Sequence, residues 1–122
     1  MPMTPDDAMR LIDGQLTHIW MVRTFLKHSE EAEEDDDLME IVRGLYDYLL
    51  AVGPALRSGD AVEYLKIARK KFSKLQQTTA QFAELQPQIS IHTNFIMALA
   101  SLQLAVAEVG KLLEESGGSS SE

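Results

Sequence analysis

The chain has 122 residues, of which 45% are hydrophobic and 25% are charged, a composition typical of one soluble domain large enough to bury a core. It contains no cysteine, which excludes disulfide frameworks, thiolate zinc sites and cysteine nucleophiles. The net charge of −8 disfavours binding of nucleic acid or of an anionic membrane by the whole surface.

The negative charge is concentrated in one segment. Residues 30–40 hold eight acids and no base, whereas the rest of the chain holds eleven acids and eleven bases. This acidic patch consists of Glu30, Glu31, Glu33, Glu34, Asp35, Asp36, Asp37 and Glu40. It is expected either to attract a basic protein partner in a salt-dependent manner or to remain a solvated connector. A smaller basic cluster consists of Lys66, Arg69, Lys70, Lys71 and Lys74. We interpret it as a solvated face of a helix in preference to a nucleic-acid contact.

The first helix is expected to begin at Thr4-Pro5, because a hydroxyl N-cap followed by proline is typical of a helix start. Its apolar residues recur at steps of three and four to about His28. The residues before it lack the basic region and the apolar core of a secretory signal peptide, so we expect a cytoplasmic protein.

The second helix follows the acidic patch and carries an apolar seam that begins at Leu38 and ends at Leu56. Gly53-Pro54 is expected to end or kink this helix, because proline lacks the backbone N–H and its ring meets the preceding turn. If the helix ends there, its last residue is Val52.

The third helix is expected to begin at Asp60, which with Glu63 resembles a capping box. Gln86-Pro87-Gln88 predicts the turn that follows it. The last helix carries an apolar seam with steps of three and four: His92, Phe95, Leu99, Leu102, Val106, Val109 and Leu113. Its most apolar stretch, residues 95–109, is shorter than the ~20 residues of a membrane span, so we expect no membrane contact.

Four amphipathic helices joined by short connections predict an all-α, antiparallel up-down-up-down four-helix bundle. We assign residues 1–115 to this domain and residues 116–122 to a disordered Gly/Ser tail. The alternative is a two-chain assembly in which hairpins from each copy make the bundle together, with Gly53-Pro54 as the hinge.

The last helix is apolar on more than one side. Beyond its seam it carries five further apolar residues: Ile96, Met97, Ala100, Leu104 and Ala107. A monomeric bundle would leave part of this surface in water, so we predict a homodimer interface along this helix. The alternative is that the helix is enclosed within one chain, with Trp20 and Met21 of the first helix covering it.

Histidines and acids meet at one end of the predicted bundle, where His28, the acidic patch and His92 come together. Imidazole nitrogens and carboxylate oxygens suit a divalent metal, so His28, Glu31 and His92 form the alternative hypothesis of a metal site. The sequence has no Glu-x-x-His pair and no calcium-loop pattern. We therefore expect neither a metal nor a cofactor.

Polar residues also intrude on apolar faces. His18, Gln15 and Arg23 are expected to form either a small pocket or an ordinary boundary layer on the first helix. Tyr46 and Tyr48 either form an aromatic contact surface or lie at the core edge with their hydroxyls in water. No phosphate-binding loop, nucleophile elbow or paired-carboxylate motif occurs in the sequence. The sequence thus predicts a non-enzymatic interaction protein.

Overall fold

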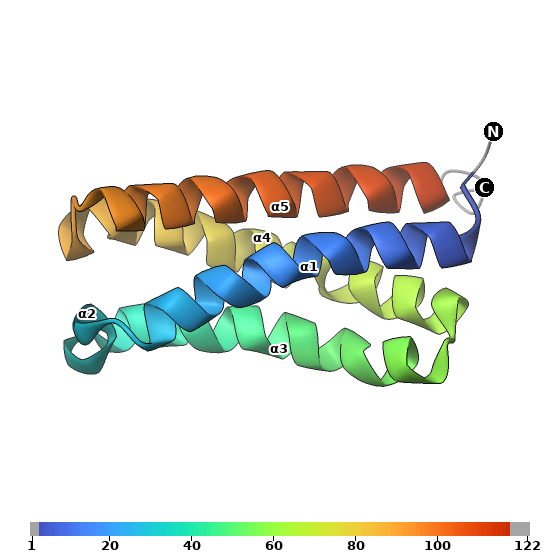
Figure 1. The fold of residues 1–122 in the computed structure, drawn as a ribbon, viewed down its shortest axis with the longest axis horizontal. Helices are drawn as coiled ribbons and strands as arrows, with labels where there is room; N and C mark the ends of the chain where they lie inside the picture. Colours follow the sequence, from blue (N-terminus) through green and yellow to red (C-terminus); the bar gives the residue numbers. More distant parts are fainter. Residues whose placement is uncertain (1–2, 118–122) are drawn as a thin grey trace.

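The computed structural model describes residues 3–117, which form the all-α up-down-up-down bundle that the sequence predicts. Its four long helices are α1 (Pro5–Lys27), α3 (Asp36–Ser58), α4 (Ala61–Ile89) and α5 (Thr93–Gly117). A short helix, α2 (Glu30–Glu34), connects α1 to α3. The long helices follow one another around the bundle in chain order, and α5 closes the ring against α1 (Figure 1). One chain therefore completes the bundle.

The predicted helix starts are confirmed at Thr4 and Asp60. Each side chain accepts a hydrogen bond from the backbone N–H three residues later, at 3.0 and 3.1 Å respectively. Ser29 and Asp35 cap α2 and α3 in the same way. The acidic patch is therefore helical, because its first half forms the capped helix α2 and its second half caps and begins α3.

The end predicted for the second helix is wrong. α3 does not stop at Val52 but continues through Pro54 to Ser58. The missing N–H of Pro54 frees the carbonyl of Leu50, and both residues lie on the solvent side of α3, where water can replace the lost bond. The helix ends instead at Gly59, whose φ of 74° is the left-handed conformation that glycine adopts readily.

α4 also passes its predicted end, since Gln86-Pro87-Gln88 lies inside its last turn. The chain reverses at residues 90–92, so His92 precedes α5 and is exposed rather than part of its apolar seam. Its Nδ1 accepts a hydrogen bond from the backbone N–H of Asn94 at 3.0 Å. α5 extends to Gly117, two residues beyond the predicted domain boundary, and residues 118–122 of the predicted tail lie outside the described residues.

The core is one apolar stripe from each long helix, as the helical spacing of the sequence predicts. Its largest fully buried side chains are Tyr64, Phe82, Ile12, Ile19, Leu26, Leu38, Leu45, Leu75, Leu102, Val52 and Val109. Two buried tyrosine hydroxyls tie helices together. Tyr48 donates to the carbonyl of Ala68 at 2.9 Å, and Tyr64 donates to Asp13 Oδ1 at 3.3 Å.

Candidate functional site

The outward side of α5 is an apolar surface. Leu104 is 74% exposed, Met97 56% and Ile96 43%, while Ala107 is exposed and Ala100 half-buried between them. We call these five residues the α5 face. Residues 93–107 carry no charged side chain, so the α5 face, which runs from Ile96 to Ala107, is uncharged over about three helical turns. Surfaces of this kind mark contact sites in soluble proteins.

The first helix does not cover the α5 face. Trp20 lies on the other side of α1, where its ring packs against that of Tyr46 in α3 with centroids 6.4 Å apart. Met21 is itself 62% exposed. α1 also exposes Leu11 and Phe25, and the Phe25 ring packs edge-on against Phe95 in the first turn of α5, with centroids 5.1 Å apart.

α5 is longer than its most apolar stretch suggested. Over Thr93–Ser116 it is long and apolar enough to cross a membrane, by length and composition alone. The sequence-based expectation counted residues 95–109 only, and the helix continues beyond them. The opposite side of α5 supplies core residues such as Leu102 and Val109, and the core helix of a soluble bundle meets the same criterion.

The metal-site hypothesis placed His28, Glu31 and His92 together. Glu31 and His92 do line one cavity of about 300 Å³ at the acidic end of the bundle, but His28 does not. Within residues 3–117, no three His, Asp or Glu side chains are grouped so that they could hold a metal ion. The alternative metal-binding function therefore lacks its ligand set in this part of the chain.

The acidic patch lies at the same end of the bundle. Asp35 is half-buried and caps α3, and Glu31 is half-buried at the cavity. The other six acids of the patch are exposed. Its contact with a basic partner stays a prediction.

Arg23 does not form a pocket with Gln15 and His18, since His18 is exposed. Its guanidinium carbon lies 4.5 Å from the ring centroid of Trp20 and 4.9 Å from that of Tyr46, within cation–π range of both. The Nε atom of Arg23 is buried and has no hydrogen-bond partner among the described residues. Arg23 thus joins α1 to α3 through aromatic rings.

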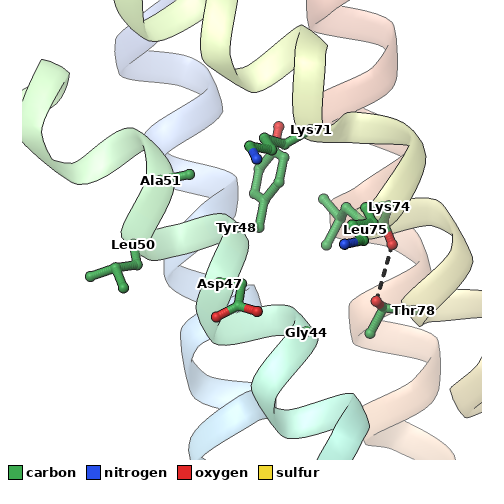
Figure 2. Close-up of a pocket in the computed structure, with 9 residues that line it drawn as sticks. All are labelled: Gly44, Asp47, Tyr48, Leu50, Ala51, Lys71, Lys74, Leu75 and Thr78. Atoms are coloured by element: carbon green, nitrogen blue, oxygen red, sulfur yellow. Dashed lines mark hydrogen bonds between the residues drawn. The ribbon is translucent and has the colours of Figure 1, made fainter.

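A second candidate site is a cavity of about 390 Å³ between α3 and α4 (Figure 2). It is lined by Gly44, Asp47, Tyr48, Leu50, Ala51, Lys71, Lys74, Leu75 and Thr78. Tyr48, Leu75 and Thr78 are buried, at 3%, 1% and 8% exposure, and form its inner wall. Burial raises the pKa of Tyr48 far above that of an ordinary tyrosine, so its hydroxyl stays protonated and bonded to α4.

Charged side chains stand around this cavity, with Asp47 on α3 facing Lys71 and Lys74 on α4 (Figure 2). All three residues are exposed. The ion pair found among residues 3–117 joins Arg10 to Asp7, so Asp47, Lys71 and Lys74 form none with one another. The cavity therefore separates one carboxylate from two ammonium groups.

The helical pattern of the sequence does not predict this cavity. A signal was present in Gly44 and Ala51, which are small residues one helical turn either side of Tyr48. Whether these small residues border a cavity depends on which side chains of α4 face them, and the pattern of a single helix does not contain that information. Arg23 is similar, because its position on α1 did not indicate that it stacks on two aromatic rings.

Comparison with protein-family models, with curated proteins and with solved structures found no match. The α5 face and the α3–α4 cavity are the two features of the described residues that suit a binding partner.

Proposed function

We propose that this protein is a non-enzymatic helical-bundle interaction module that self-associates through the α5 face. The observation that carries the proposal is the exposure of Leu104, Met97 and Ile96 on a helix surface without charge. Burying these side chains against a partner releases apolar surface from water, which drives association.

A second copy of the chain suits this surface, because the α5 face is complementary to itself in an antiparallel pairing. Ile96 and Leu104 lie four residues either side of Ala100. If a two-fold axis passes at Ala100, Leu104 of each copy packs against Ile96 of the other, and the small Ala100 side chain lets the helices approach closely. A two-fold interface requires this reciprocal pairing of unlike positions.

Charge also favours the antiparallel pairing. α2 and the acidic patch lie at the end of the bundle where α5 begins (Figure 1). Two antiparallel α5 helices point these ends in opposite directions, whereas a parallel pairing sets them side by side. Since each chain carries a net charge of −8, the antiparallel arrangement reduces repulsion between the copies.

The first experiment measures mass in solution by sedimentation velocity, from about 5 to about 500 µM protein, because a surface of a few helical turns supports a dissociation constant in the micromolar range. We expect a monomer–dimer equilibrium that Leu104→Glu abolishes while helicity is retained. Val62→Glu is the matched control, because Val62 is 68% exposed on α4 outside the α5 face. A parent chain that stays monomeric at every concentration, or a dimer insensitive to Leu104→Glu, overturns the proposal.

The second experiment tests the register. Since the chain has no cysteine, Ala100→Cys introduces a single thiol at the proposed axis, and Ser73→Cys introduces one at an exposed position of α4. Mild oxidation should cross-link Ala100→Cys at least about tenfold faster than Ser73→Cys, because a preformed pair raises the effective concentration of the thiols. Equal rates contradict the pairing. A monomeric parent that floats with lipid vesicles would instead assign the α5 face to lipid.

A further inference from the structure

The cavity between α3 and α4 has the size of a small-molecule site. Its volume of about 390 Å³ falls in the range of ligand pockets, roughly 300–1,000 Å³. At about 30 Å³ for each water-sized group, it holds on the order of a dozen non-hydrogen atoms. The α5 face contributes no residue to it, so ligand binding in this cavity does not depend on self-association.

The cavity is built into the packing of α3 on α4. Gly44 and Ala51 leave space on either side of the Tyr48 ring, which the hydrogen bond to Ala68 at 2.9 Å keeps from turning into it. At one end, Gly44 closes the cavity by lying directly against Thr78, where an added Cβ would stand 2.7 Å from Oγ1. The inner wall and one end of the space are thus bounded by buried side chains.

The charged side chains at the opening of the cavity, which we call its mouth, determine which ligand charge is favoured there. Lys71 and Lys74 place two ammonium groups on the α4 side, and Asp47 places one carboxylate on the α3 side. The local sum is one positive charge, and Lys66 and Lys70 on the same helix raise the positive potential, whereas Arg69 donates to Ser116 of α5 and points away from the cavity. A monoanion neutralises this site, whereas the Asp47 carboxylate repels a second negative charge.

We propose that the α3–α4 cavity binds a small organic monoanion with an apolar body, such as an arylalkyl or medium-chain carboxylate. The carboxylate pairs with the ammonium groups of Lys71 and Lys74 at the mouth. The apolar body packs on Tyr48, Ala51 and Leu75 on the inner wall.

The test is a ¹H–¹⁵N NMR titration of the full chain with 3-phenylpropionate. We expect saturable shifts at the amides of Gly44, Ala51 and Thr78, with a dissociation constant below about 1 mM, and binding of the neutral 3-phenylpropan-1-ol weaker by at least about fivefold. Shifts that do not saturate, shifts centred on the α5 face, or equal binding of the alcohol overturn the proposal.

Two double variants distinguish the effect of the lysines at the mouth on binding from the effect of the other positive charges of α4. Lys71→Met with Lys74→Met should weaken 3-phenylpropionate binding by about tenfold or more. Lys66→Met with Lys70→Met removes the same charge from α4 outside the cavity lining and should change binding less than about twofold. Equal losses of affinity in the two double variants would mean that only long-range charge affects binding, and would contradict direct pairing of the ligand with Lys71 and Lys74.

A third pair of variants tests occupancy and selectivity. Ala51→Leu should fill the cavity and abolish binding, with retained amide dispersion as the check that the bundle remains folded. Asp47→Asn should tighten binding about twofold or more, because it removes a like charge from the mouth. Undiminished binding by a folded Ala51→Leu variant contradicts the proposed location.

Discussion

Tyr48 of α3 donates its phenolic hydrogen to the backbone carbonyl of Ala68 in α4 across 2.9 Å. The bond is buried and joins residues 20 positions apart, so it fixes the relative position of the two helices. It also holds the Tyr48 ring as the inner wall of the α3–α4 cavity.

Tyr48→Phe should lower the free energy of unfolding by about 1 kcal/mol, because it removes one buried hydrogen bond while it keeps the packed ring. Urea unfolding followed by circular dichroism measures the change. Tyr46→Phe is the control, because Tyr46 is 38% exposed, and its effect should stay within about 0.5 kcal/mol. Equal effects of the two substitutions would contradict a special contribution of the buried hydroxyl.

Stability should fall at alkaline pH. Burial raises the pKa of both Tyr48 and Tyr64, and the carboxylate of Asp13 raises that of Tyr64 further. The folded chain therefore keeps phenolic protons that the unfolded chain releases above about pH 10. The associated stability is fully present below that pH and is lost as the pH rises through the folded-state pKa values.

Between about pH 10 and pH 11.5 the unfolding free energy should decrease by at most about 1.4 kcal/mol per pH unit for each of the two tyrosines. Urea unfolding at several pH values measures this slope. The double variant Tyr48→Phe, Tyr64→Phe should lose most of it, and a slope that the double variant leaves unchanged would rule out the two phenols as its source.

Gly44 and Thr78 should be energetically coupled. Gly44→Ala improves helix propensity by about 1 kcal/mol, but its Cβ would lie 2.7 Å from Thr78 Oγ1, and such overpacking costs about 1–3 kcal/mol. We expect Gly44→Ala to destabilise the parent chain and to stabilise a Thr78→Ala chain. A double-mutant cycle of urea unfolding energies measures the coupling, and additive effects would contradict the close contact.

Two glycines should respond oppositely to the same substitution. Gly59→Ala forces an alanine into the left-handed conformation, φ 74°, and should cost about 1 kcal/mol. Gly14→Ala lies inside α1, where an added Cβ has no atom within 4 Å, and should gain up to about 1 kcal/mol. Thermal unfolding of both variants checks the prediction, and changes of the same sign would contradict it.

The sequence predicted the features that depend on local spacing. The three- and four-residue steps of apolar side chains gave the buried stripes, and Thr4 and Asp60 gave two helix starts, because a cap acts within a single turn. Gly53-Pro54 was expected to end or kink its helix and Gln86-Pro87-Gln88 to form a turn, but neither proline ends its helix. Whether proline ends a helix depends on whether the carbonyl that it frees can reach water, and both prolines are exposed.

Features that depend on the packing of two helices were harder to predict from the sequence. His92 was placed on an apolar seam, although the chain reverses there and the imidazole accepts a hydrogen bond at the start of α5. The α3–α4 cavity needs Gly44 and Ala51 to face Lys71 and Lys74, and no single-helix pattern contains that pairing. The exposed apolar side of α5 could be predicted from the sequence, because a helix that is apolar around most of its circumference has more apolar surface than its neighbours can cover.

Trp20 is the one tryptophan of the chain, and its indole stands between α1 and α3, beside Tyr46, with the guanidinium of Arg23 close to both rings. The molecule therefore contains an intrinsic fluorophore at a single seam. Because Arg23 lies on α1 with Trp20, separation of α1 from α3 takes the Tyr46 ring away from the indole and changes its emission, while the opposite seam between α4 and α5 contains no tryptophan. Stopped-flow fluorescence thus follows the separation of α1 from α3, and circular dichroism follows the unfolding of all the helices.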